Sequence, residues 1–366
     1  MKIKAALSRT AGQPLSLETL ELGSLRDDEV LVRVVASGIC HTDIGMRDSA
    51  SRVPRPIVLG HEGAGVVLDA GKDVGKVKPG DHVVMSFDTC GACHSCVRGE
   101  VAYCRHLGQY NFAGKRLDGS TALGKGQEAI HSHFFGQSSF ATHAVCHERN
   151  AVLVDKDLPL EILGPLGCGF QTGAGAVINS LRVAPGHTLA VFGTGAVGLA
   201  AVMAANVAGA ATVVAVDTNA ARLKLAAELG ATHVIDAARE EVFSSLRSIV
   251  PQGVNFALDT TGNLDVIRQA TSNLAPLGVC GLINTARGAD LSANILELVL
   301  GGRSVRGIHQ GDSRPDLFIP LLIDLYRQGR FPFDRLLSFY DLADINAALS
   351  DMQAGRSIKP VIRMPA

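Results

Sequence analysis

One glycine-rich run constrains the fold of this chain more than any other feature: TLAVFGTGAVGLAAV, which begins at Thr188. It holds the pattern G-x-G-x-x-G at Gly193, Gly195 and Gly198, between a β-branched stretch and an apolar, helix-like stretch. In this context the first glycine permits a tight turn and the second lets the backbone approach a pyrophosphate. The third allows a helix to pack closely on a strand. The run therefore predicts a βαβ unit that binds a dinucleotide.

A carboxylate follows where an adenosine ribose would lie. The next predicted strand, AATVVAV, ends in Asp217. A carboxylate at this place accepts hydrogen bonds from ribose hydroxyls and repels a 2′-phosphate, so NAD is favoured over NADP. Arg222 follows on the next predicted helix, where it lies either over the ribose or in solvent.

Strand-like and helix-like stretches alternate from about Gly167 to about Gly307. The alternation predicts an α/β fold with a Rossmann-type, doubly wound parallel sheet. Before it, short apolar stretches bounded by Gly, Pro and Asp predict a β-rich domain. We therefore expect a β-rich domain over residues 1–169, a dinucleotide domain over 170–307 and a return of 308–366 to the first domain.

Four cysteines are packed into CGACHSCVRGEVAYC, at Cys90, Cys93, Cys96 and Cys104. Thiolates at this spacing can close a tetrahedron around Zn²⁺, which predicts a structural site. Iron–sulfur runs that begin similarly continue with C-x3-C-P, whereas this run has a longer gap and no proline. His94, inside the cluster, is expected to face solvent.

Two of the other cysteines stand in sequence contexts that suggest metal ligands. Cys40 lies in GICHTD, Cys168 in GPLGCGFQ, and His61 in VLGHEG. Two thiolates and one imidazole from separate loops would leave a fourth coordination position open, as in catalytic zinc sites. Taken singly, each is better explained as a buried or satisfied side chain. Cys146 and Cys280 have no such neighbours and are expected in the core.

Composition excludes several classes of function. Across 366 residues, 34 Lys and Arg stand against 35 Asp and Glu, so neither nucleic acid nor an anionic membrane is an expected partner. The uncharged run over 188–216 is interrupted by glycines and lacks flanking anchors, which argues against a membrane span. Clustered cysteines and the lack of an apolar leader favour a reducing, cytoplasmic location.

The phrases GHEGAGVV, C-x2-C-x2-C-x7-C, PLGCG and GTGAVG, in this order, resemble the zinc-dependent medium-chain alcohol dehydrogenases. The resemblance covers essentially the whole chain. It implies a GroES-like catalytic domain, a catalytic zinc on Cys40, His61 and Cys168, and a structural zinc in the cysteine lobe. Glu62 matches a carboxylate that approaches the metal during ligand exchange.

The resemblance also implies a reaction, in which zinc acts as a Lewis acid and a hydride passes from the alcohol to NAD. Thr42 matches the hydroxyl that relays the alcohol proton, and Asp43 matches the carboxylate that orients His61. The implied cofactor contacts are His41 and Lys359 at the pyrophosphate and Thr172 and Val197 at the nicotinamide.

Gly45 departs from the better-known relatives, which have a histidine that completes the proton relay. We expect the proton to leave through water or through His41, and the missing side chain to leave room for a bulky alcohol. Phe87 and Phe140 are either walls of such a pocket or core residues.

FFGQSSFATHAV, LGPLGCGFQTGAGAVINSL and SIKPV look closest to the benzyl (aryl) alcohol branch, which also includes enzymes for allylic alcohols such as geraniol. Aliphatic alcohols, polyols and a thiol adduct of formaldehyde are alternative substrates. A non-catalytic nucleotide-binding relative is an alternative of another class. A homodimer or homotetramer is expected.

Overall fold

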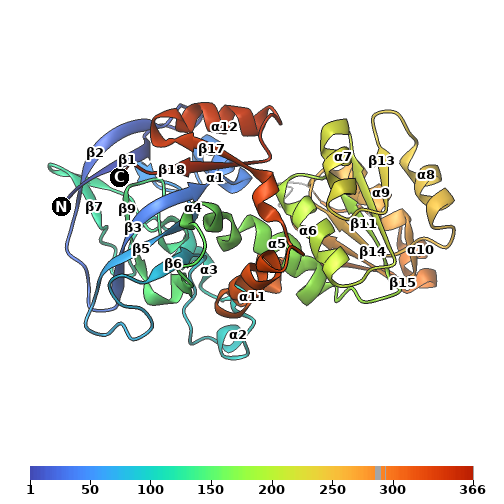
Figure 1. Cartoon of the computed structure of the whole chain (residues 1–366), viewed down its shortest axis with the longest axis horizontal. Helices are drawn as coiled ribbons and strands as arrows, with labels where there is room; N and C mark the ends of the chain where they lie inside the picture. The colour runs from blue at the N-terminus through green and yellow to red at the C-terminus, as the bar shows by residue number, and fades with distance from the viewer. Residues whose placement is uncertain (285–289, 293, 366) are drawn as a thin grey trace. The chain divides into compact units, whose positions relative to one another are not determined.

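The computed structural model describes residues 1–284, 290–292 and 294–365, and its contacts divide the chain into two compact units (Figure 1). Unit 1 holds Met1–Cys168, Arg314–Pro320 and Asp334–Ala366, and unit 2 holds Gly169–Ser313 and Leu321–Phe333. The expected tail of residues 308–366 is thus shared between the units. Residues 308–313 and 321–333 group with the nucleotide unit, which therefore includes the end of helix α11 (Pro315–Arg327).

Unit 1 is built around two β-sheets in the described residues. The smaller sheet has the order β4-β1-β2-β7-β8. Its strands are β1 (Lys2–Ser8), β2 (Ser16–Leu22), β4 (Ile57–Val58), β7 (Leu123–Lys125) and β8 (Glu128–Ile130). The larger has the order β10-β6-β5-β3-β18-β17, and β9 also pairs with β3. Its strands are β3 (Glu29–Gly38), β5 (Glu62–Ala70), β6 (His82–Met85), β9 (His143–His147), β10 (Ala151–Val154), β17 (Leu337–Asp341) and β18 (Lys359–Arg363).

The centre of the larger sheet positions the chemistry of unit 1. Strand β3 lies between β5 and β18, and Gly38, its last residue, is paired with Glu62 on one side and Val361 on the other. Cys40 follows the end of β3, and His61 directly precedes the start of β5. Helix α12 packs on β18 (Figure 1).

The helices of unit 1 are short. They are α1 (His41–Asp48), α2 (His94–Val97), α3 (Leu107–Asn111), α4 (Leu160–Leu163) and α12 (Ile345–Gln353). A core cluster of buried apolar residues links the smaller sheet with α1 and α12, and it includes Phe87 and Phe140 at 3% and 0% exposure. Both phenylalanines are therefore core residues.

Unit 2 contains the predicted doubly wound sheet, in the order β13-β12-β11-β14-β15-β16 with every pair parallel. Its described strands are β11 (Thr188–Phe192), β12 (Thr212–Asp217), β13 (His233–Asp236), β14 (Val254–Asp259), β15 (Leu274–Leu282) and β16 (Ser304–Gly307). This order is that of a Rossmann sheet, which binds dinucleotides where the order reverses, beside β11. The predicted fold class is confirmed.

Helices connect these strands, as Figure 1 shows in green to orange. They are α6 (Ala196–Val207), α7 (Ala220–Glu228), α8 (Val242–Ile249), α9 (Leu264–Ser272) and α10 (Ile295–Gly301), and α5 (Gly169–Gly175) precedes β11. Alanines dominate the buried part of α6, which lets this helix pack close to the sheet. The uncharged run over 188–216 becomes β11, α6 and β12. In the described part of the chain, every helix is too short or too polar to cross a membrane.

Candidate active site and metal centres

Cys40 is held at the start of helix α1. It is the N-cap of the helix in an extended conformation, and its backbone N–H donates to Oδ2 of Asp43 at 2.9 Å. The N–H of Asp43 in turn donates to the carbonyl of Cys40 at 3.0 Å. This reciprocal capping fixes the first turn of α1, and with it the position of the Cys40 thiol.

Asp43 also holds His61. Its Oδ1 lies 2.8 Å from Nδ1 of His61 and accepts the N–H of Gly60 at 3.1 Å. All of these groups are buried. With Nδ1 donating to a carboxylate, Nε2 carries the lone pair, and this buried atom has no hydrogen-bond partner in the described chain. An orphaned imidazole nitrogen oriented by a carboxylate is the arrangement of a metal ligand.

Cys168 reaches the same place from a turn that packs on β6. It follows the 3₁₀ turn Gly164–Gly167, whose last glycine lies so close to β6 that a Cβ would be 2.2 Å from the carbonyl oxygen of Met85. Ser86 Oγ donates to the carbonyl of Gly167 at 2.7 Å. Backbone contact of this kind requires glycine, and it brings the next residue, Cys168, into the buried site.

The ligand atoms of Cys40, His61, Glu62 and Cys168 all lie within 4.8 Å of one another. The donor set of two sulfurs and one imidazole suits Zn²⁺, with the carboxylate as a fourth donor nearby. The residues present therefore fit a catalytic zinc. The structure brings together all four residues that the sequence had suggested.

The pKa values of the three candidate ligands Cys40, His61 and Cys168 are shifted in different directions. The hydrogen bond from the Cys168 thiol and the charges of His61 and Lys359 hold the pKa of Cys40 well below its usual range, although burial opposes this. The pKa of Cys168 is raised by the same hydrogen bond and by burial. Burial lowers the pKa of His61, but Asp43 and Cys40 raise it more, to about 10. Ligation by both sulfurs and Nε2 therefore requires protons to leave.

Glu62 is wholly buried, and burial raises its pKa to about 7 against the opposing charge of Lys359. Lys359 begins β18, and its Nζ donates to Oε1 and Oε2 of Glu62 at 2.9 and 2.8 Å. The resemblance had assigned Lys359 to the cofactor pyrophosphate. In the structure this side chain is 1% exposed and faces the carboxylate beside the metal ligands instead.

A loop that sequence reasoning did not assign braces His61. Gln137 Nε2 donates to the carbonyl oxygens of His61 and Ser86 at 3.0 and 3.2 Å, and its Oε1 accepts the N–H of Gly63 at 3.1 Å. The amide thus clamps the backbone on both sides of Glu62. Gln137 lies within the phrase FFGQSSFATHAV that carried the family resemblance, but no role followed for it from the sequence; the tertiary fold brings it to β5.

Aromatic rings complete the surroundings of His61. The Phe135 ring stacks on the imidazole, with centroids 4.4 Å apart at 25°, and Phe134 meets it edge-on at 5.6 Å. Phe112, which is half-buried, lies edge-on to Phe135 at 5.2 Å. Phe135 adopts a left-handed backbone conformation, φ 50° and ψ 36°, which is uncommon for a bulky side chain. The hydrogen bond from Asn150 Nδ2 to its carbonyl helps to hold it there.

The proton-relay candidates lie on the first turn of α1. His41 is exposed and Thr42 is half-buried, directly after Cys40. A Cβ on Gly45 would meet no atom within 4 Å, so this position leaves open space.

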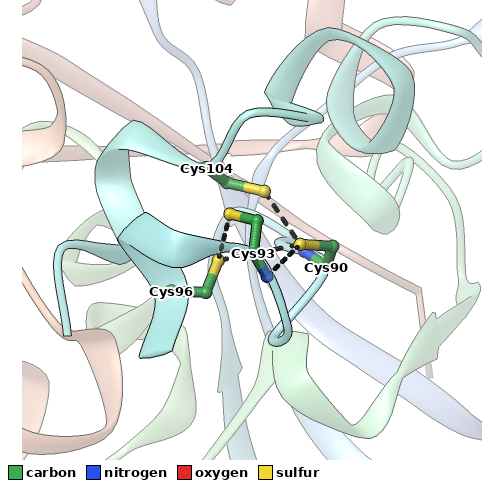
Figure 2. Close-up of side chains that lie close together, drawn as sticks. All are labelled: Cys90, Cys93, Cys96 and Cys104. Carbon is green, nitrogen blue, oxygen red and sulfur yellow. Dashed lines mark hydrogen bonds between the residues drawn. The ribbon is translucent and has the colours of Figure 1, made fainter. Parts of the chain in front are cut away.

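The second cysteine group forms a compact lobe (Figure 2). Sulfur–sulfur distances are 3.5 Å for Cys93 and Cys96 and 3.9 Å for Cys90 and Cys96. A tetrahedron with Zn–S bonds of about 2.3 Å has edges of about 3.8 Å, so the four thiols fit a structural zinc. His94 is exposed on α2, as expected.

Backbone N–H groups point at the sulfurs of this lobe. Cys93 N–H donates to the sulfur of Cys90 at 3.2 Å, and Cys90 N–H to that of Cys104 at 3.3 Å. Hydrogen bonds from the N–H groups of Arg105 and Cys96 lower the pKa of Cys93 to about 6. Such donors stabilise thiolates, the form that binds zinc. Cys146 and Cys280 lie in apolar clusters outside both groups, and burial raises the pKa of each.

In unit 2 each glycine of the G-x-G-x-x-G run has the predicted kind of surroundings. Gly193 has φ 87°, which a tight turn requires. A Cβ on Gly198 would lie 1.9 Å from the carbonyl oxygen of Gly193, so helix and turn are in contact. A Cβ on Gly195, the N-cap of α6, would point into open space. That space is the cradle that a pyrophosphate would occupy.

Asp217 ends β12 and closes the turn after β11. Its Oδ2 accepts the N–H and the hydroxyl of Thr194 at 2.6 and 2.8 Å, and its Oδ1 accepts the N–H of Asn219 at 2.9 Å. Arg222 is half-buried on α7, and its Nε has no hydrogen-bond partner among the described residues.

The two nicotinamide candidates of unit 2 are brought together by helix packing. A Cβ on Gly173 would lie 2.0 Å from the carbonyl oxygen of Val197, so α5 contacts the start of α6. Thr172 precedes that glycine, and its hydroxyl lies 3.5 Å from Oε1 of Gln310. Gln310 was not anticipated from the sequence.

Comparison with known proteins agrees with this arrangement. Residues 26–156 match the alcohol dehydrogenase GroES-like domain, and residues 196–326 match the zinc-binding dehydrogenase family. The geraniol dehydrogenase of Castellaniella defragrans is 46% identical over 362 residues, which is 98% of this chain and 97% of that protein.

Solved structures are similar over their whole length. An alcohol dehydrogenase zinc-binding domain protein from Burkholderia ambifaria is 50% identical with a TM-score of 0.98, and both chains are covered completely. The benzyl alcohol dehydrogenase of Acinetobacter calcoaceticus is 43% identical with a TM-score of 0.97, also over 100% of both chains. The resemblance inferred from the sequence is confirmed: the chain belongs to the zinc-dependent medium-chain alcohol dehydrogenases, in the branch that includes the geraniol and benzyl alcohol dehydrogenases.

Proposed function

We propose that this alcohol dehydrogenase interconverts primary aryl or allylic alcohols and their aldehydes with NAD as the hydride carrier. The observation that carries the substrate class is the stack of Phe135 on His61. Two relatives named for geraniol and for benzyl alcohol support the same class.

Phe134 and Phe135 belong to the same buried cluster as Phe87 and Phe140, but their rings contact the imidazole of His61, and Phe112 packs on Phe135. They therefore place flat apolar surface next to a metal ligand. An alcohol whose oxygen binds beside His61 would lay its α-carbon substituent near these rings. An aryl or allylic group gains stacking contacts there, whereas a polyol would lose the hydration of its hydroxyls. The open space at Gly45 leaves room for a bulky substituent on the alcohol.

A zinc ion held by Cys40, His61 and Cys168 would supply Lewis-acid chemistry, which lowers the pKa of an alcohol hydroxyl. The chain itself orients the imidazole through Asp43 and takes up the proton. Thr42 is the first acceptor in this proposal, and the exposed His41 or water leads the proton to solvent. If His41 is the base, His41→Gln will shift the pH profile of hydride transfer; an unchanged profile leaves water as the exit.

The preference for NAD is supported by Asp217. Its carboxylate already accepts three hydrogen bonds from the chain, so it is fixed in place with its negative charge at the end of β12. Four lone-pair positions are available on a carboxylate, which leaves one for a ribose hydroxyl. A 2′-phosphate would meet the same charge and be repelled.

A variant at Phe135 tests the substrate class. Phe135→Leu keeps an apolar side chain but removes the ring, so we expect kcat/KM for benzyl alcohol relative to ethanol to fall about tenfold. Phe243→Leu, at an exposed position of α8, is the matched control and should leave the ratio unchanged. An unchanged ratio in Phe135→Leu would remove the aromatic stack as the basis of selectivity.

Aliphatic alcohols, polyols and a thiol adduct of formaldehyde are the alternative substrates for the same machinery. Steady-state comparison of benzyl alcohol, geraniol, ethanol and sorbitol separates the aryl and allylic class from aliphatic alcohols and polyols. A non-catalytic relative is the alternative of another class. The complete donor sets of both metal groups argue against it. Fewer than two zinc ions per chain together with no hydride transfer to NAD would favour it.

We also propose that the protein is a homo-oligomer whose contact includes α10. Large apolar side chains at Leu277, Ile295, Leu296, Val299 and Leu300 are 64% to 80% exposed. They lie beside β16, the last strand of the parallel sheet in the described chain, whose outer edge can pair with a second copy. Leu300→Lys should lower the mass measured by light scattering; an unchanged mass would exclude this face.

A further inference from the structure

The contact between Lys359 and Glu62 spans three neighbouring strands. Glu62 begins β5 and Lys359 begins β18, with β3 between them. Gly38 of β3 is paired with Glu62, and a Cβ at Gly38 would lie 2.2 Å from Oε2 of Glu62. Because Gly38 has no side chain, the Glu62 carboxylate can cross β3 and reach the ammonium group.

The ammonium group of Lys359 donates hydrogen bonds to both carboxylate oxygens of Glu62. Its Nζ lies 2.9 Å from Oε1 and 2.8 Å from Oε2 of Glu62, and 3.0 Å from the carbonyl oxygen of Ile39. An ammonium group carries three donors and no acceptor, which suits contacts to a carboxylate and a backbone carbonyl. The side chains are 1% and 0% exposed. A buried, doubly bonded ion pair of this kind holds its partners in one geometry.

The carboxylate that Lys359 holds is also a candidate metal ligand. One of its oxygens lies within 4.8 Å of the ligand atoms of Cys40, His61 and Cys168. A fourth protein donor would close the tetrahedron around zinc, and a closed tetrahedron is typical of structural sites. A catalytic site must instead keep one position for substrate. Something therefore has to keep the Glu62 carboxylate off the metal.

We propose that Lys359 is a positioning residue that restrains Glu62 beside the metal and so keeps the fourth coordination position open. In this role the ammonium group competes with the metal for the same two oxygens. Gly38 contributes by giving the carboxylate the room to face Lys359. The role differs from the contact with the cofactor pyrophosphate that the family resemblance implied for this lysine.

The test measures access to the metal in the absence of any cofactor. The protein is loaded with Co²⁺ at the catalytic site, and imidazole is titrated as a monodentate ligand while the visible absorption of the metal is followed. In Lys359→Met the released carboxylate should occupy the fourth position, and the affinity for imidazole should fall at least about tenfold. The absorption of the imidazole-free variant should also differ from that of the parent.

Two further variants separate positioning from a general structural effect. In Lys359→Met with Glu62→Gln the neutral amide is a poor metal ligand, so imidazole affinity should return to within about threefold of the parent. Lys359→Arg keeps a bidentate cation and should stay close to the parent. If Lys359→Met does not fold, Lys359→Gln, which keeps a donor but loses the charge, replaces it against the same double variant.

The outcomes are distinct. Weak imidazole binding in the single variant with recovery in the double variant supports the proposal. Parent-like binding in Lys359→Met overturns it, since a lysine that serves only the cofactor pyrophosphate has no effect without cofactor. Weak binding that persists in the double variant also overturns it, because the loss would then not pass through the Glu62 carboxylate.

Discussion

Nδ1 of His61 lies 2.8 Å from Oδ1 of Asp43, and both side chains are buried at the start of helix α1. The same carboxylate accepts the N–H groups of Cys40 and Gly60. One side chain thus sets the backbone around one metal-ligand candidate and the ring orientation of another. Asp43 therefore positions two of the candidate ligands of the catalytic metal, Cys40 and His61.

Replacing Asp43 should therefore loosen the metal more than it loosens the fold. In Asp43→Asn the neutral amide holds the imidazole weakly, so zinc affinity should fall about 10- to 100-fold. The rate of zinc transfer to a chromogenic chelator measures this. Asp48→Asn, at the exposed end of the same helix, serves as control and should behave like the parent. Equal zinc release from both variants would show that Asp43 does not orient His61.

The zinc site of the cysteine lobe should stabilise the fold and take no part in catalysis. Cys96→Ser removes one ligand from the buried side of the lobe and should release the structural zinc, lowering the melting temperature by more than about 4 °C. The other zinc should stay bound, as elemental analysis can show. Ser95→Ala, a substitution in the same lobe that removes no thiol, is the control and should keep both zinc ions and the melting temperature of the parent. A Cys96→Ser protein that keeps both zinc ions would contradict the assignment.

Two glycines of the nucleotide loop should respond differently to the same substitution. Gly198→Ala places a methyl group against the Gly193 carbonyl and should cost about 2 kcal/mol of unfolding free energy. Gly195→Ala meets open space at a φ of −74° that alanine adopts freely, so the fold should keep its stability. NAD affinity should nevertheless fall about tenfold, because the methyl group fills the pyrophosphate cradle. Calorimetry and fluorescence titration check both, and reversed behaviour of the two variants would refute this reading of the loop.

Acid should weaken unit 1 through Glu29. Burial alone would raise the pKa of this carboxylate, but His133 and Arg116 lower it to about 2 from an ordinary 4.5. A lowered pKa stabilises the fold above pH 4.5, and the stabilisation is lost as the pH falls toward 2. Discounted for solvent screening, its size is on the order of 1–2 kcal/mol at neutral pH.

Glu29→Gln should therefore be destabilised at pH 7, and its deficit relative to the parent should shrink on acidification. Urea denaturation at several pH values measures the difference. Glu100→Gln, at an exposed position, should show no deficit at any pH. A deficit for Glu29→Gln that is constant with pH would mean that packing, rather than charge, accounts for the loss.

The sequence predicted what depends on local pattern. The glycines at 193, 195 and 198 need only a strand before them and a helix after them, so their roles could be read from spacing. The four clustered thiols are close in sequence and therefore close in space. Cys40, His61 and Cys168 come from separate loops, so their sequence contexts only suggested a shared site; the family resemblance made it a definite expectation, and the structure brings the three together.

What escaped prediction depends on pairing between distant segments. Lys359 reaches Glu62 because β18 pairs with β3, a contact that no local pattern encodes. Phe135 lies on His61 through a left-handed backbone conformation that its residue type disfavours. For Phe87 and Phe140 the sequence left two readings, a pocket wall or the core, because apolar character fits both; the structure places them in the core.

The most direct test of the whole account is one steady-state comparison of benzyl alcohol, geraniol, ethanol and sorbitol, each with NAD and with NADP. We expect kcat/KM to be highest for benzyl alcohol or geraniol with NAD, and about tenfold or more lower with NADP because of Asp217. Highest efficiency with sorbitol or ethanol would contradict the aromatic site around His61, and a preference for NADP would contradict the role given to Asp217.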